Sequence, residues 1–350
     1  MWLILFFLVS AAAVAEPIPP HAGEVGVLNT LSYFRSTANY TNSFGTSSSD
    51  LALGGYFSTL QDSVSANYDL NPSIRILAGT GYGYSTASNS ASTYTGSNLT
   101  EIDGGAQYWW KSRIWAIAAS VNAGFPLYRI SQTTTQDSLV TDGSSFAEGG
   151  VWGIGYFNNF QPFAYAGYRY RDSGMSGLIM LDGGTSYRFP TARLRVGLRG
   201  ETTMGTDNYT GQAYQRAVVT DRVDNSSLKF YAVNPTYFEG YLEGEWLLNR
   251  MWEAGAGIAQ TFMGANSAQG FTVTATIKMR LQTRKEVPRV EMPEPASPFK
   301  ADQPKKRFEP TDEEDDAPPV AKPKKPMRRR KSLQQNLDET QKSLDHTQEE

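Results

Sequence analysis

The chain has 350 residues, with 32 basic and 35 acidic side chains and no cysteine. The lack of cysteine excludes disulfides, thiol catalysis and cysteine-ligated metals. The near balance of charge identifies no partner, and it gives no reason to expect nucleic acid.

The N-terminal segment reads MWLILFFLVSAAAVAEP, with an apolar run from Trp2 to Val9. This run is shorter than the ~20 residues that span a bilayer as a helix. Ala13, Val14 and Ala15 fit the small-x-small pattern that precedes a signal cleavage site. We therefore expect residues 1–15 to be a signal peptide and the protein to be exported; a retained N-terminal anchor is the alternative.

Residues 24 to 283 are rich in Gly, Tyr, Thr and Ser and alternate in polarity over short segments. In FTVTATIKMRL (271–281) the apolar residues share one parity, while the threonines, Lys278 and Arg280 share the other. This period of two predicts strands. The predicted strands are 24–36, 52–69, 73–85, 99–110, 113–126, 146–158, 162–172, 176–189, 192–203, 228–247, 251–263 and 270–282. The phase slips between Phe57 and Val64, so a bulge or a count of ten or fourteen strands is the alternative.

The connections between these strands tend to alternate in length. Short turns are expected at 69–73, 110–113, 158–162, 188–192 and 247–251, and longer polar stretches at 85–98, 130–145 and 205–227. The link at 172–175 is short on the long-loop side. In this pattern residues 24–283 resemble Gram-negative outer-membrane barrel proteins, without a motif that fixes one family. The resemblance implies an all-β fold: a transmembrane antiparallel up-and-down β-barrel of about twelve strands over residues 16–285.

Aromatic residues lie near both ends of the predicted strands. Trp110, Phe189, Trp246 and Trp252 are beside the short turns. Such residues form girdles at the two interfaces of a membrane barrel. A soluble β-sandwich or propeller with an aromatic core is the competing interpretation.

The composition changes near residue 285. Residues 286–350 hold ten of the 18 prolines and two aromatic residues. Such a segment cannot bury enough apolar surface to fold alone. We expect a disordered charged tail in the periplasm. After the last proline it could form a short helix, either a weak coiled coil or a frayed helix in solvent. Barrels of this class commonly end on an aromatic residue, whereas the last predicted strand here ends near Leu281 and a tail follows.

The charged residues of the predicted strands share the parity opposite to the apolar ones. In YFEGYLEGEW (237–246), Glu239, Glu243 and Glu245 alternate with an apolar face. If the apolar face meets lipid, the charged face lines the lumen. The residues expected there are Glu239, Glu243, Glu245, Arg193, Arg195, Arg199, Glu253, Lys278, Arg280, Arg169, Arg171, Asp182, Arg188, Arg75, Glu101 and Asp103. They could fill and rigidify the barrel or line a channel.

Neither catalysis nor a cofactor is predicted. The two histidines, His21 and His346, lie outside the predicted strands, and no metal-ligand spacing occurs. The favoured hypothesis is a passive outer-membrane channel for small hydrophilic solutes. The alternative is a structural, anchoring or surface-interaction barrel whose tail (286–350) binds the cell wall or a periplasmic protein. The sequence leaves open whether 130–145 or 205–227 folds inward as a plug.

Overall fold

The structure is a computed structural model that describes residues 19–131 and 136–283. The expected signal peptide (1–15), the expected tail (286–350) and its helix lie outside the described residues. Among the described residues, no helix has the length and apolar character needed to cross a bilayer.

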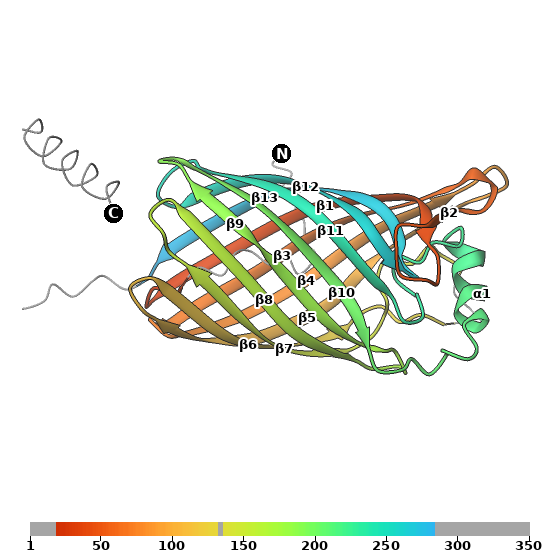
Figure 1. Ribbon diagram of the computed structural model, residues 1–350, viewed down its shortest axis with the longest axis horizontal. Coiled ribbons are helices and arrows are strands. Elements are labelled where there is room, and N and C mark those ends of the chain that lie inside the picture. The colour runs from red at the N-terminus through yellow and green to blue at the C-terminus, as the bar shows by residue number, and fades with distance from the viewer. Residues whose placement is uncertain (1–18, 132–135, 284–350) are drawn as a thin grey trace, which may run out of the picture. The chain divides into compact units, whose positions relative to one another are not determined.

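The described residues form an antiparallel sheet that closes into a barrel (Figure 1). Each strand of the wall pairs with its neighbour in the chain, and β13 pairs with β1 to close the ring. The wall has twelve strands: β1 (Glu24–Tyr40), β3 (Tyr56–Asn71), β4 (Ile74–Ser88), β5 (Thr93–Lys111), β6 (Trp115–Pro126), β7 (Phe146–Gly155), β8 (Phe160–Arg171), β9 (Gly177–Arg188), β10 (Ala192–Met204), β11 (Thr236–Leu247), β12 (Trp252–Ala265) and β13 (Ala268–Gln282). The predicted all-β up-and-down barrel of twelve strands is confirmed.

Two further elements lie at one end of the barrel (Figure 1). The short β2 (Ser48–Asp50) pairs with the end of β1, and a 3-10 turn (Ala52–Gly54) follows it. The helix α1 (Tyr214–Val223) lies in the connection between β10 and β11. Its buried residues Arg216, Val219, Thr220 and Val223 recur at the spacing of one helix face.

The connections define two ends of the barrel. At the short-turn end they are 72–73, 112–114, 156–159, 189–191 and 248–251. At the other end, the long-loop end, they are 41–55, 89–92, 127–145, 172–176, 205–235 and 266–267. The predicted long stretch 85–98 is wrong, because β4 and β5 continue to Ser88 and from Thr93. Its threonines and Tyr94 favour the extended backbone.

Two other sequence expectations are corrected. The strand predicted from residue 228 begins at Thr236, because residues 205–235 form the connection that holds α1. The alternative of a bulge between Phe57 and Val64 is excluded in the described pairing, since β3 keeps continuous register with β1 from Phe57 to Tyr68. The phase slip arises because Phe57 is fully buried against Phe230 of the β10–β11 connection, with ring centroids 6.0 Å apart.

Candidate functional site

Each strand of the wall has one exposed apolar face and one face that is shielded from solvent. On β10, Leu194, Val196 and Leu198 are 44%, 50% and 58% exposed, whereas Arg195 is 5% exposed. A soluble sheet would expose its charges and bury its leucines. The face that carries the charges is called the shielded face below.

A ladder of ion pairs joins the shielded faces of β10 and β11. The register sets Arg193 opposite Glu245, Arg195 opposite Glu243 and Arg199 opposite Glu239. The Arg193 and Arg195 guanidinium groups lie 3.3 and 3.4 Å from their partners' carboxylates. Arg199 contacts Glu239 directly and lies 3.9 Å from Glu243. Every base of this ladder therefore has an acid opposite it.

Aromatic side chains fix the ladder against β8 and β9. Arg195 also binds Asp182 of β9 at 3.0 Å. Its guanidinium lies 4.3 Å from the ring centroid of Phe163 and 5.2 Å from that of Tyr241. These rings hold the planar guanidinium in place by cation–π attraction.

A second charged group lies on β7 and β8. Arg169 binds Glu148 at 2.9 Å, and the Tyr165 hydroxyl donates a hydrogen bond to the same carboxylate at 2.6 Å. The Tyr165 ring stacks on Trp152, with centroids 4.5 Å apart. Charged and aromatic side chains thus lie next to one another on the shielded face.

The remaining predicted site residues are distributed around the wall. Glu253 binds Arg280 at 2.9 Å and lies 3.9 Å from Lys278. Arg75 binds Asp69 at 2.6 Å, and Arg171 binds Asp142 at 3.2 Å. Asp103 lies over Gly79 of β4, where a Cβ would come 2.6 Å from its carboxylate. Glu101 is half-buried on β5, and Arg188 is exposed at the short-turn end of β9.

Several residues of these groups were not among those predicted. They are Asp69, Asp142, Glu148, Tyr165 and Tyr241, with Trp109, Trp152 and Phe163 from the buried aromatic cluster. The parity of the sequence could have found some of them. Tyr241 shares the parity of Glu239 and Glu243, and Trp109 that of Asp103.

The four aromatic residues predicted as a girdle lie next to the short-turn end. Trp110, Phe189, Trp246 and Trp252 are 54%, 50%, 50% and 37% exposed. They lie at or beside the ends of β5, β9, β11 and β12. All four side chains therefore lie near the same end of the barrel, although they come from different parts of the wall.

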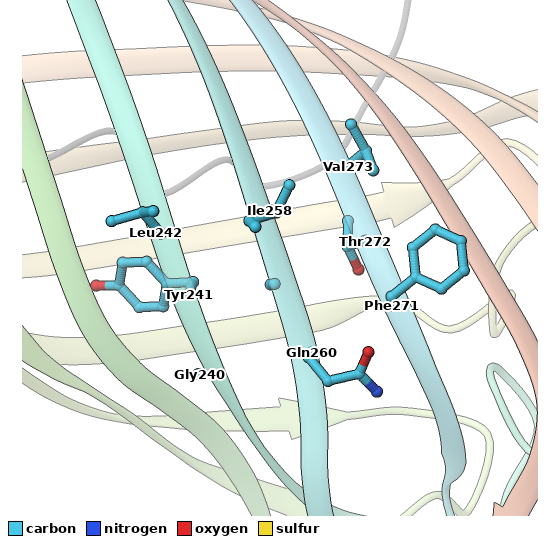
Figure 2. A pocket seen from close by; sticks show the side chains of 9 residues that line it. Gly240, Tyr241, Leu242, Ile258, Gln260, Phe271, Thr272 and Val273 are labelled. Carbon is cyan, nitrogen blue, oxygen red and sulfur yellow. The ribbon is translucent and has the colours of Figure 1, made fainter.

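A hollow of about 450 Å³ lies where β11, β12 and β13 run side by side (Figure 2). Its rim includes the exposed apolar side chains of Leu242, Ile258 and Val273. The β12–β13 ladder ends at Gln260 and Phe271, which also line the hollow. Because its apolar rim belongs to the exposed face, the hollow lies away from the ion pairs.

Two long connections pack together at the long-loop end (Figure 1). They are the β6–β7 connection (127–145) and the β10–β11 connection (205–235), and their described residues are called the cap below. Leu139, Val219, Val223 and Tyr231 form its buried core, together with Met175 of the β8–β9 turn. The apolar core of the cap is therefore shared with a turn of the wall.

A buried ion pair supports this core. Arg216 of α1 binds Asp207 at 2.8 Å, and both side chains are almost fully buried. The Arg216 guanidinium lies 5.0 Å from the ring centroid of Tyr209 and 4.9 Å from that of Tyr231. α1 is thereby fixed to the rest of its connection.

Asp224 joins the two connections of the cap. Its carboxylate accepts hydrogen bonds from the Leu139 N–H at 2.8 Å and the Ser138 hydroxyl at 3.1 Å. Burial raises the pKa of Asp224 to about 7, although both hydrogen bonds favour the charged form.

The β6–β7 connection lies against the shielded face of β3 and β4. The Ser85 hydroxyl donates to the Ser138 carbonyl at 3.0 Å, and the Gln61 amide donates to the Val140 carbonyl at 3.1 Å. A Cβ built on Gly83 would lie 2.9 Å from the Cβ of Val140. Glycine at this position lets the connection approach the wall.

The β10–β11 connection places Lys229 next to the shielded face. Its ammonium lies 4.1 Å from the ring centroid of Phe34 on β1 and 5.9 Å from that of Tyr237 on β11. Burial lowers the pKa of Lys229, while the charges of Glu239 and Glu201 act to raise it. Lys229 is thus a cation inserted near the acids of the ladder.

The described residues contain no group of three or more His, Cys, Asp or Glu side chains that could hold a metal ion. The charges are instead arranged as acid–base pairs.

Comparison with known proteins finds likeness in structure alone. No protein-family model and no curated protein matches the sequence. The crystal structure of the COG4313 outer membrane channel from Pseudomonas putida F1 is similar over 78% of this chain and 100% of that one, with a TM-score of 0.58. The fold is that of an outer-membrane β-barrel. At 10% identity the likeness shows the fold and no more.

More distant barrels are also similar. The translocator domain of the autotransporter NalP from Neisseria meningitidis has a TM-score of 0.44 and 12% identity, over 75% of this chain and 89% of that one. The NanC porin has a TM-score of 0.42 and 7% identity, over 73% of this chain and all of that one. Neither is close enough to bear on function.

Proposed function

We propose that the protein is a passive channel of the outer membrane that admits small hydrophilic solutes through a charge-lined lumen. The ladder of Arg193, Arg195 and Arg199 against Glu245, Glu243 and Glu239 carries this proposal. Alternate residues of a closed barrel point inward and outward. Since the exposed face is apolar and suits lipid, the shielded charged face is assigned to the lumen.

The size of the barrel supports a narrow conduit. About eight strands make a barrel that side chains fill, whereas roughly sixteen leave an aqueous channel. Twelve strands lie between these limits. Opposed rows of acids and bases in such a lumen create a transverse field that selects solutes by charge.

The placement in the membrane follows from the same features. The short-turn end is assigned to the periplasm, because barrels of this kind have short periplasmic turns and longer outer loops. Trp110, Phe189, Trp246 and Trp252 would form the aromatic girdle at that interface. Both ends of the wall, Glu24 and Gln282, lie at this side, so the tail would enter the periplasm.

A structural barrel is the second candidate function. Trp109, Trp152, Phe163 and Tyr165 are buried in one cluster on the shielded face, which reduces the space for solutes. In this case the tail (286–350) would provide the activity by binding the cell wall or a periplasmic protein. A pull-down with the full chain and with a variant that ends at residue 285 tests this; retention of the same partners by both contradicts it.

Single-channel recording in planar bilayers tests the channel. Purified full-length protein that shows heat-modifiable gel mobility should give discrete conductance steps, and boiled protein should give none. Absence of conductance steps from the folded protein at every voltage and pH tested would overturn the proposal.

A further inference from the structure

We propose that the outer surface of the wall over β1, β11, β12 and β13 is a lipid-binding site, which holds a phosphate-bearing lipid by its phosphate and by one acyl chain. Two adjoining hollows of different chemistry carry this inference. It uses the membrane placement proposed above and does not require that the barrel conducts.

A second, polar hollow adjoins the apolar one between β11, β12 and β13. Its volume is about 190 Å³, and the two hollows share Gln260 and Phe271, which Figure 2 shows at the edge of the apolar hollow. The polar hollow is lined in addition by Arg35, Thr37 and Gln269. A polar recess and an apolar recess therefore meet on one surface of the wall.

Arg35 supplies the positive charge of the polar hollow. It shares the parity of the exposed Leu31 on β1, so it lies on the exposed face of the wall. Its guanidinium lies 4.4 Å from the ring centroid of Tyr56, which holds it by cation–π attraction. Arg35 takes part in none of the ion pairs of the described residues. A charge on a lipid-facing surface is costly unless it is paired, and the phosphate of a lipid would pair with it.

The height of Arg35 on the barrel suits this pairing. Trp252 of the girdle is opposite Met279, and Arg35 is opposite Phe271, which lies eight residues away from Met279 on β13. At about 3.3 Å per residue and a tilt of about 40°, this interval is about 20 Å of height. The apolar band of such barrels is about 25 Å tall. Arg35 would therefore lie just inside the outer boundary, where its long side chain reaches the headgroups.

The apolar hollow lies deeper in the membrane than Arg35 and is open because Gly240 has no side chain. A Cβ built on Gly240 meets only the Leu198 Cδ2 atom, at 3.6 Å. The next row of the exposed face toward the girdle consists of Leu242, Ile258 and Val273. In a membrane this face is surrounded by lipid, in which acyl chains lie beneath the phosphate. A lipid with its phosphate at Arg35 would thus place an acyl chain over the apolar hollow.

Native mass spectrometry of the folded full-length protein in neutral detergent tests the site. The probes are phosphatidic acid, diacylglycerol with the same chains, and inorganic phosphate. Phosphatidic acid should bind at least about tenfold more tightly than either of the other two, because only it fills both hollows. Equal binding of phosphatidic acid and diacylglycerol would overturn the assignment of the phosphate to Arg35. Equal binding of phosphatidic acid and inorganic phosphate would overturn the assignment of the acyl chain.

Two substitutions test the hollows separately. Arg35→Gln removes the charge, and Gly240→Leu fills the apolar hollow from its open edge. Each should weaken the binding of phosphatidic acid by about tenfold, and Arg35→Lys should restore part of the loss because it keeps a positive charge. Binding at the wild-type level by folded Arg35→Gln, or by folded Gly240→Leu, contradicts the proposal.

The controls make the same changes elsewhere on the barrel. Arg113→Gln removes an exposed base at the short-turn end, and Gly153→Leu adds a leucine to β7, where a Cβ meets nothing within 4 Å. Both should bind phosphatidic acid as the wild type does, and an equal loss in them would show that the effect is not specific to the hollows. Lipid binding without conductance would reject the channel and leave the lipid site standing, whereas conductance without lipid binding would do the reverse.

Discussion

Tyr241 of β11 donates a hydrogen bond from its hydroxyl to Asp182 of β9 at 2.7 Å, although β10 lies between the two strands. The ring crosses β10 at Gly197, where a Cβ would come 2.5 Å from the hydroxyl oxygen. Asp182 also binds Arg195 of β10. One carboxylate therefore ties three adjacent strands together, and a missing side chain makes the crossing possible.

Replacing Gly197 with alanine should displace Tyr241. The added Cβ would also lie 2.8 Å from the carbonyl oxygen of Gly183, so backbone as well as side chain must shift. Overpacking of this kind costs about 1–3 kcal/mol. Urea unfolding in lipid vesicles, followed by tryptophan fluorescence, measures the loss. Gly153→Ala is the matched control, because a Cβ there meets nothing within 4 Å; equal stability of the two variants would refute the expectation.

Removing the Tyr241 hydroxyl should weaken the same tie without adding bulk. A hydrogen bond to a charged group contributes about 1.5–3 kcal/mol, so Tyr241→Phe should lower the free energy of unfolding by that order. A double-mutant cycle with Asp182→Asn isolates the pair. Additive losses in the cycle would show that the two groups do not interact in solution.

The ladder should set the ion selectivity of the channel. Arg195→Gln leaves Glu243 and Asp182 without their shared base, so the reversal potential in a salt gradient should move toward cation preference. Glu243→Gln should move it the other way. The charge swap Arg195→Glu with Glu243→Arg keeps the sum of charges and should return selectivity toward the wild-type value. Identical reversal potentials for all variants would place the ladder outside the permeation path.

The stability of the cap should depend on pH through Asp224. Its pKa is about 7 in the folded cap, against about 3.9 for a solvated aspartate. Because the folded cap has the raised pKa, it is favoured most at low pH, and this advantage is lost as pH rises toward 7. The shift corresponds to about 4 kcal/mol at most. We therefore expect faster proteolysis within residues 205–235 at about pH 8 than at about pH 5.

Asp224→Asn is the control for this dependence, because it cannot titrate. Other groups near the site are Tyr128 and Asp137 of the β6–β7 connection and Asp221 and Arg222 at the end of α1. The pKa of Tyr128 is raised to about 12 by burial, so it stays neutral over this range. A pH response of equal size in Asp224→Asn would assign the effect to a different group.

The Arg216–Asp207 pair should hold the cap as a unit. Arg216→Ala leaves a buried carboxylate unpaired, and breaking such a pair costs about 3–5 kcal/mol. The cost should appear as faster proteolysis within 205–235, with heat-modifiable mobility of the barrel retained. The exposed Arg113 gives the control variant, Arg113→Ala, which should be cleaved at the wild-type rate.

Parity in the sequence was enough to place most of the wall. The alternation in residues 192–201 and 237–246 predicts which side chains share a face, and the observed register sets Arg193, Arg195 and Arg199 opposite three glutamates. A closed barrel makes this possible, because each strand meets two predictable neighbours and two different environments. The alternation of polarity is broken where a side chain of the shielded face meets the cap, as at Phe57.

The cap could not be predicted from local pattern. The buried face of α1 includes Arg216 and Thr220 beside two valines, so its sequence does not look amphipathic. Arg216 is buried because Asp207 and two tyrosine rings surround it, and these come together only in the folded chain. Gly83 likewise gives no sign in the sequence that Val140 will lie against it.

The pairing of Glu24 with Gln282 has a kinetic consequence. These residues lie at opposite limits of the wall, so the last seam brings together segments with the greatest separation along the barrel chain. Contacts of such long range form late and slowly. Until they form, β1 and β13 each present an unpaired edge that can associate with another chain. The protein is therefore most prone to aggregate in the interval before the ring closes. A chaperone that covers either edge would protect it.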